Sequence, residues 1–157
     1  PYVHPELYTL YDYEHYVTET HDRYSVQIGP LTAQRNVYTT GGGEGLYYFV
    51  FPNLMLNVVP GRLQLNVVTP TAVDRCQVLF RYYYDDLDTP GADERIEADL
   101  RFSDHVQRED AEICARVQQG LGSRAYDRGR FSVRFEEGVH HFQQLLKQTY
   151  RDYLASR

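Results

Sequence analysis

Asp110 lies among apolar residues that recur at helical spacing, which is an unusual place for a carboxylate. At about 100° per residue, the apolar residues that share its side of a helix are Val106, Ile113, Val117 and Leu121. A charged carboxylate that is removed from water without a partner costs several kcal/mol. Asp110 therefore needs a cation, hydrogen-bond donors or a metal ion. The helical spacing alone is compatible with two interpretations. Asp110 is either a buried structural residue that pairs with an Arg or a backbone amide, or a metal ligand.

His4 is the candidate imidazole for a metal site, because Pro5 stiffens the chain directly after it. A single histidine in a loop is usually solvated or hydrogen-bonded, so His4 alone indicates nothing. Gln107 and Gln118 flank the helical side that carries Asp110 and can donate hydrogen bonds to it. An ordinary polar flank accounts for the two glutamines equally well.

The composition narrows the classes of protein to which the chain can belong. Its 157 residues are enough for one domain with a core. Sixteen Lys and Arg against 22 Asp and Glu give a net charge of −6, and no basic stripe for nucleic acid or an anionic membrane is present. No apolar run approaches the roughly 20 residues of a membrane span. The start at Pro1 without a signal peptide predicts a fragment. The two cysteines, Cys76 and Cys114, favour a cytoplasmic protein in which both are small core residues.

The elements that must position these residues begin with a β region. The runs with the alternation and composition of strands are Tyr24–Ile28, Gln34–Tyr38, Leu46–Phe51, Asn53–Val59, Arg62–Thr69 and Cys76–Tyr84. Pro60-Gly61 is a two-residue connection, so it predicts a hairpin in which Val59 faces Arg62. The apolar residues that this register places on one face of the sheet are Leu54, Leu56, Val58, Leu63, Leu65 and Val67. In particular, Leu56 opposes Leu65.

After the strands, the period of the sequence changes to that of helices. We expect a helix over 93–102, a second that Ser103 or Asp104 caps and that ends near Gln119, and a third over 137–154. Residues 1–23 predict a loop with at most a helical turn, and 41–45 predict a flexible turn. The order indicates an α+β domain: an antiparallel β-sheet meander with C-terminal helices packed on it.

Several motifs in this order resemble one family. They are His4-Pro-Glu-Leu7, Phe51-Pro-Asn-Leu-Met-Leu-Asn57, Arg108-Glu-Asp-Ala-Glu-Ile-Cys114, Val117-Gln-Gln-Gly-Leu121, Tyr126-Asp-Arg-Gly-Arg130 and Glu137-Gly-Val-His-His-Phe142. Together they resemble the catalytic domain of Rieske non-haem iron ring-hydroxylating oxygenases (α subunit), nearest to the branch of choline monooxygenase and related amine oxygenases. The resemblance covers nearly the whole chain. It implies a helix-grip, START-like fold.

The resemblance also implies a metal site. The family holds a mononuclear Fe(II) with two histidines and one aspartate; His4 matches the second histidine and Asp110 the aspartate. The first histidine would lie two residues before Pro1. No Cys-x-His and Cys-x-x-His pair for a [2Fe–2S] Rieske cluster is present. Residues 1–157 therefore resemble the C-terminal part of a catalytic domain, a fragment that we expect to be inactive alone and whose N-terminal Rieske domain is missing.

The function that the resemblance implies is that of an oxidoreductase, a Rieske-type mono- or dioxygenase. It would activate O2 to hydroxylate or demethylate a small aromatic or amine substrate, as in aromatic hydrocarbon catabolism. Electrons would come from NAD(P)H through a reductase or ferredoxin, and the intact protein would be a homotrimer. The competing hypothesis is an iron-free helix-grip domain that binds an apolar small molecule.

The substrate pocket is the least defined part of this hypothesis. Its candidate lining residues share two strand segments and are Phe49, Phe51, Asn53, Met55 and Asn57. Alternation separates the two faces of a sheet but does not tell which face meets the substrate. The 15 tyrosines of the chain could form a cage for a quaternary ammonium group or could be ordinary strand residues.

Overall fold

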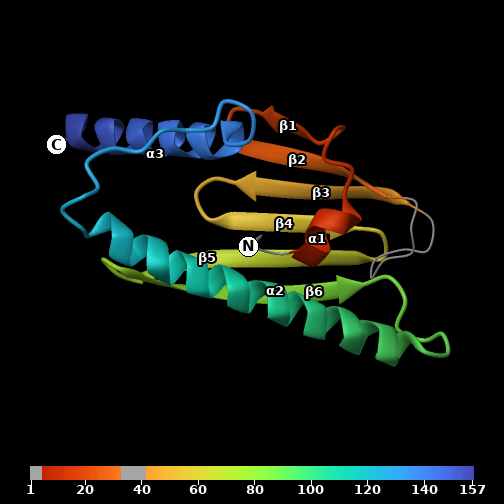
Figure 1. The fold of residues 1–157 in the computed structure, drawn as a ribbon. Coiled ribbons are helices and arrows are strands. Elements are labelled where there is room, and N and C mark those ends of the chain that lie inside the picture. Colours follow the sequence, from red (N-terminus) through yellow and green to blue (C-terminus); the bar gives the residue numbers. More distant parts are fainter. Residues whose placement is uncertain (1–4, 33–41) are drawn as a thin grey trace.

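The protein is a single antiparallel sheet with helices on one side (Figure 1). The computed structural model describes residues 5–32 and 42–157. The six strands follow one another in chain order across the sheet: β1 (Val17–Thr20), β2 (Tyr24–Leu31), β3 (Gly43–Val50), β4 (Leu54–Val59), β5 (Arg62–Ala72) and β6 (Arg75–Tyr84). The helices are α1 (Pro5–Leu10), α2 (Ala92–Leu121) and α3 (Glu137–Ala155). The antiparallel sheet followed by helices confirms the predicted α+β class, and the expected strand over 34–38 lies outside the described residues.

The hairpin predicted at Pro60-Gly61 is confirmed in every pair. Val59 pairs with Arg62, Val58 with Leu63, and Leu56 with Leu65. Gly61 has φ 78°, a left-handed conformation that glycine adopts without steric cost. The turn residues and the alternation of the two strands thus specify the same register.

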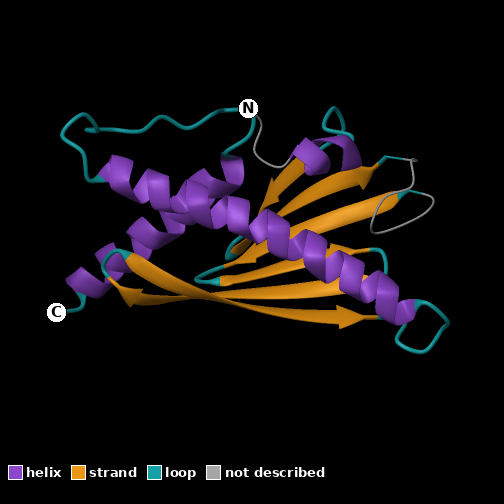
Figure 2. Ribbon diagram, turned by 60° about the horizontal axis from the view of Figure 1, so that its bottom comes forward, coloured by secondary structure: helices purple, strands orange, loops and turns teal. Residues whose placement is uncertain are grey.

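The long helices α2 and α3 lie over one face of the sheet (Figure 2), and the buried residues of β5 on that face are polar. Arg62, Gln64 and Asn66 are the buried residues of β5, whereas the alternate residues Leu63 and Leu65 are only half-buried. The six apolar side chains of the hairpin therefore share the face that carries neither α2 nor α3. On β6, Leu79 and Tyr83 extend this apolar face and are about half exposed.

Two features of the N-terminal third differ from expectation. Residues 17–20, expected within a loop, form β1 at the edge of the sheet. Residues 43–45, expected within a flexible turn, open β3. A Cβ atom at Gly45 would lie 2.8 Å from the Tyr11 hydroxyl, so the glycine of this strand makes room for a packed tyrosine ring.

The two helices expected over 93–119 are one continuous helix, α2, and the expected break is wrong. Ser103 does not cap a second helix: it is buried, and its Oγ accepts a hydrogen bond from Arg62 at 3.0 Å. No glycine or proline interrupts the chain between Ala92 and Gln119, so nothing stops the helix until Gly122. None of the helices in the described part of the chain has the length and hydropathy to cross a membrane.

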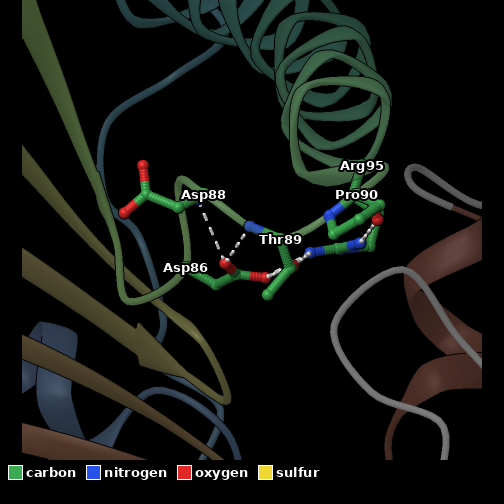
Figure 3. Close-up of polar contacts among 5 residues, drawn as sticks. All are labelled: Asp86, Asp88, Thr89, Pro90 and Arg95. Atoms are coloured by element: carbon green, nitrogen blue, oxygen red, sulfur yellow. Dashed lines mark hydrogen bonds and ion pairs between the residues drawn. The ribbon is translucent and has the colours of Figure 1, made fainter.

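The loop before α2 is organised around Asp86 (Figure 3). Its Oδ1 accepts backbone hydrogen bonds from Asp88 and Thr89 at 3.3 and 3.1 Å. Its Oδ2 pairs with Arg95 of the first turns of α2. The loop is thereby tied to the start of the helix.

The apolar residues toward the C-terminal end of α2 were expected to be buried, and they are not. Ile113, Val117 and Leu121 are 39–54% exposed, so the stripe is buried only toward its N-terminal part. Cys76 and Cys114 are exposed as well, and their expected place in the core is wrong. By contrast, α3 starts at the predicted residue and packs on the sheet through Gly138, whose missing Cβ would lie 3.4 Å from Ser25 Oγ.

Candidate active site between α2 and the sheet

Asp110 is half-buried in α2, one turn beyond Val106 and Gln107. Those two residues line a small cavity of about 70 Å³ between the helix and the sheet. On a helix, residues three and four apart lie on the same face, so Asp110 continues the side of α2 that borders the cavity. Asp110 itself does not line the cavity; it lies one turn farther along the helix and is half-buried there.

Polar and apolar side chains both line the cavity. The sheet contributes Tyr47, Asn57, Arg62 and Gln64, and α2 contributes Phe102, Ser103, Val106 and Gln107. The guanidinium is neutralised by Asp99, because Arg62 Nη1 lies 2.8 Å from both carboxylate oxygens. Gln64 Nε2 donates to Asn66 Oδ1 at 2.8 Å. The wall thus presents amide and hydroxyl groups with no uncompensated charge from the Arg62–Asp99 pair.

Four tyrosines and Gln27 line a second space, of about 200 Å³, which is open to solvent and shares Tyr47 with the first. They are Tyr11, Tyr13, Tyr16 and Tyr47, which we call the tyrosine cage. The rings of Tyr13 and Tyr16 stack with centroids 5.6 Å apart, and that of Tyr11 meets Tyr47 edge-on at 5.9 Å. Tyr47 lines both spaces.

Tyr13 and Tyr16 of the cage are neutral at physiological pH. Burial raises the pKa of Tyr16 to about 12, with a further contribution from Tyr13. Burial also raises the pKa of Tyr13 above its usual value. The Tyr11 and Tyr47 hydroxyls contact each other, and the Tyr16 hydroxyl donates to Gln27 Oε1 at 3.2 Å. Four aromatic side chains and one amide side chain thus line this space.

The residues that the sequence suggested for the pocket separate into two groups. Asn57 lines the cavity beside α2. Phe49 and Phe51 pack instead against Phe142 of α3, with ring centroids 5.0 and 6.1 Å apart. Asn53 donates from Nδ2 to the Val68 carbonyl at 2.9 Å, and the half-buried Met55 pairs with Phe49 and Asn66 in the sheet.

The candidates around Asp110 separate in the same way. Gln107 lines the cavity, whereas Gln118 is exposed about three turns farther along α2. His4 lies outside the described residues. Within residues 5–32 and 42–157, no three His, Cys, Asp or Glu side chains come together as a metal site. A half-buried carboxylate on the helix that lines this cavity nonetheless fits one position of a divalent-metal site.

Sequence reasoning missed the buried pair of Arg62 and Asp99. These side chains are 7% and 5% exposed and come from residues 37 apart in the chain. The alternation Arg62-x-Gln64-x-Asn66 was a signal that one face of this strand is polar. Nothing in the local sequence indicates that the helix, and not solvent, covers that face.

Comparison with protein families identifies the domain. Residues 1–152 match the model of the ring hydroxylating alpha subunit (catalytic domain). The chain belongs to this family. The ring-hydroxylating match spans α2, the sheet and most of α3, and so includes Asp110 and both cavities.

Individual relatives are choline monooxygenases. The chloroplastic choline monooxygenase of Arabidopsis thaliana is 37% identical over 150 residues, which cover 93% of this chain and 35% of that protein. The enzyme of Amaranthus tricolor is 29% identical over 153 residues, covering 95% and 34%. The chain thus spans about a third of the length of the curated relatives that it matches.

Solved structures of a quaternary ammonium Rieske monooxygenase, CntA, have the same fold. One aligns with a TM-score of 0.78 at 21% identity over 93% of this chain and 42% of that chain. The complex of CntA with L-carnitine aligns with a TM-score of 0.70 at 20% identity, covering 93% and 40%. At this identity the likeness describes the arrangement of sheet and helices.

Proposed function

We propose that this domain is the catalytic part of a Rieske-type oxygenase that hydroxylates or demethylates a quaternary ammonium substrate. The tyrosine cage is the observation that carries the proposal, since ring faces attract a cation that has no hydrogen to donate. The choline monooxygenases and CntA are similar proteins whose names specify substrates of this class. The finer helix-grip description of the fold belongs to the same proposal.

Asp110 and His4 would hold the mononuclear iron in this proposal. When bound, Fe(II) supplies the activation of O2. In the same proposal Gln107, on the preceding turn of α2, would orient the Asp110 carboxylate, and Gln118 would act only at the rim. Asn57 and Gln64 offer amide groups to the polar end of a substrate while Tyr47 borders both spaces. A cation in the cage would thus be held beside the helix that carries Asp110.

The remaining components of the reaction are also proposals. Electrons would reach the iron from NAD(P)H through a reductase or ferredoxin and a [2Fe–2S] cluster, in a homotrimer. The missing first histidine and the cluster would be supplied by sequence outside these 157 residues. A cytoplasmic location remains a prediction, and the curated relatives are named chloroplastic, so cell fractionation is the measurement that decides it.

Choline and its neutral carbon isostere 3,3-dimethyl-1-butanol provide the test of the cage. We expect choline to bind more tightly in calorimetric titration, because both ligands have the same shape and only choline has a charge for the rings. Tyr16→Leu should weaken choline roughly tenfold and leave the isostere nearly unchanged. Tyr24→Leu is the control, since Tyr24 stacks on His21 outside the cage. Equal affinities for the two ligands would contradict the proposal and favour an iron-free domain for apolar molecules.

Asp110→Ala tests the metal assignment separately. A full-length oxygenase carrying this sequence should bind one iron per catalytic domain, and the variant should lose it while the circular dichroism spectrum is retained. The isolated chain should bind little iron, because two ligands hold a divalent ion less firmly than three. Full iron occupancy in the variant would refute the role of Asp110.

A further inference from the structure

The attachment of α2 to the sheet is polar where helices usually use apolar side chains. The fully buried residues of this helix are Ala92, Asp99 and Ser103. The last two are bonded to one guanidinium: Arg62 Nη1 lies 2.8 Å from both Asp99 oxygens and 3.0 Å from Ser103 Oγ. Beyond residue 110, the helix is exposed as far as its end.

Two neighbouring strands converge on the same helical carboxylate. Arg62 of β5 and Tyr84 of β6 are paired in the sheet, and the Tyr84 hydroxyl donates to Asp99 Oδ2 at 2.7 Å. The carboxylate is therefore held from two directions by donors of fixed geometry. We call these four residues (Arg62, Tyr84, Asp99 and Ser103) the polar clasp.

The polar clasp lies on the same helical side as Asp110. Asp99, Ser103, Val106 and Asp110 are spaced four, three and four residues apart, which is the spacing of one helix face. Asp110 is two turns, about 10 Å, beyond Ser103. The position of the clasp along the strands thus determines which part of the sheet faces Asp110.

We propose that the Arg62–Asp99 pair is a positioning device that fixes where α2 lies along the sheet, and thereby where Asp110 lies against the cavity. An apolar contact permits a helix to slide at small cost, whereas a buried carboxylate loses its hydrogen bonds if it moves. The helix position follows from the contacts alone. The consequence for Asp110 rests on the proposed function of that residue.

The two cysteines of the sequence are natural probes of this position. Cys76 lies on β6 and Cys114 on α2, one turn beyond Asp110, and both are exposed. Spin labels on the two thiols report the separation of sheet and helix by pulsed dipolar spectroscopy, with no added cysteine. The wild-type chain should give one narrow distribution of distances.

The decisive variant replaces both members of the pair, Arg62→Met with Asp99→Leu. Apolar replacement of a buried ion pair is often neutral or stabilising, so the double variant should remain folded. We expect its mean label separation to shift by about 2 Å or more and its distribution to widen. Arg62→Lys keeps the charge, but its shorter side chain carries one nitrogen in place of Nη1, which contacts both Asp99 oxygens and Ser103, so this variant should be intermediate. Arg101→Gln is the control, because Arg101 pairs with Glu97 on the exposed side of the same helix.

The outcomes separate positioning from simple stabilisation. A folded double variant with the wild-type distance distribution would overturn the proposal, whatever its melting temperature. If the double variant does not fold, Arg62→Lys decides: a wild-type distribution there overturns the proposal as well. Loss of iron in Asp110→Ala tests the proposed function by itself, so a failure of the metal assignment leaves the distance measurement interpretable.

Discussion

Tyr84 connects the edge of the sheet to Asp99, and its phenol makes this connection sensitive to pH. Burial, followed by the hydrogen bond to the Asp99 carboxylate, raises the pKa of Tyr84. A tyrosine whose pKa is raised in the folded state stabilises fully below the unfolded value of about 10. Its contribution decreases as the pH rises above that value, because the unfolded state then loses the proton first.

Tyr84→Phe should therefore lower the free energy of unfolding near neutral pH by about 1–2 kcal/mol, since a hydrogen bond to a charged group is lost. The difference between wild type and variant should shrink as the pH rises above 10. Urea unfolding of both proteins at pH 8, 10 and 11 measures it. A difference that grows with pH would show that the hydroxyl does not donate to Asp99.

His15 and Asp12 form an exposed pair in the turn before β1, with Nδ1 2.8 Å from Oδ2. The hydrogen bond between them raises the pKa of His15 and lowers that of Asp12. The contribution of His15 to the stability of the fold is thus fully present below pH 6.5, the ordinary pKa of histidine. It is lost as the pH rises through the raised pKa of the folded state. The contribution of Asp12 to stability is present above the pKa that this residue has in the unfolded state, and it is lost as the pH falls through the lowered pKa of the folded state.

Asp12→Asn should lower the pKa of His15 in an NMR titration of its ring protons. Glu14→Gln is the control, because the charge of Glu14 is the weakest of the influences on that ring. An equal fall of the pKa in both variants would attribute the shift to general negative charge and not to the Asp12 hydrogen bond.

At the scale of elements, two glycines of different surroundings predict opposite effects of alanine. A Cβ at Gly45 of β3 would meet the Tyr11 hydroxyl at 2.8 Å, whereas a Cβ at Gly120 of α2 has nothing within 4 Å. Gly45→Ala should destabilise by about 1–3 kcal/mol through overpacking. Gly120→Ala should stabilise by about 0.5–1 kcal/mol, because alanine is the better helix former. Thermal unfolding measures both.

Choline titration of the Gly45→Ala protein tests whether Tyr11 of the tyrosine cage takes part in binding. Gly45→Ala should weaken choline because it displaces Tyr11, and Gly120→Ala should not. Unchanged choline affinity in a folded Gly45→Ala protein would indicate that Tyr11 is no part of the binding surface.

The sequence predicts elements best where two local signals agree. At Pro60-Gly61, the turn residues and the alternation of both strands require the same register, and the pairs are as expected. In α2 the local signal misleads. Serine often caps the start of a helix, but Ser103 lies inside α2, where it is buried and accepts a hydrogen bond from Arg62 of a distant strand. The strand β1, with only four mostly polar residues, is too short to show the alternation of a strand in its sequence.

The candidate site is less predictable, because its contacts join distant segments. Helical spacing places Asp110 and Gln107 on neighbouring turns of one helix; Gln107 lines the cavity and Asp110 is half-buried. The tyrosine cage joins Tyr11 to Tyr47, 36 residues apart, and the polar clasp joins residues 37 apart. No local period records such pairs.

At the scale of the whole molecule, the sheet faces differ in an unusual sense. The helices cover Arg62, Gln64 and Asn66, while the leucine- and valine-rich face is half-exposed. Contiguous apolar surface of this kind binds hydrophobic dyes. The folded domain should therefore enhance the fluorescence of anilinonaphthalene sulfonate.

Leu65→Lys, in the centre of that face, should reduce the dye signal and leave choline binding unchanged, because the cage is on the opposite side of the sheet. The measurement is the dye fluorescence of both proteins at equal concentration. Matching circular dichroism spectra are the control that both proteins are folded. An undiminished signal in the variant would assign the dye to another surface.

The unbroken length of α2 has a consequence for the engineering of this protein. The helix spans about 45 Å, from the loop that Asp86 ties down to its end beyond Asp110 (Figure 3). A rigid rod that is anchored near one end acts as a lever, and a small tilt at the anchor becomes a larger displacement farther along. If the proposed function is correct, substitutions around Asp86 and Arg95 are thus expected to alter substrate selectivity from a distance. Libraries aimed at new substrates should include this loop together with the wall of the cavity.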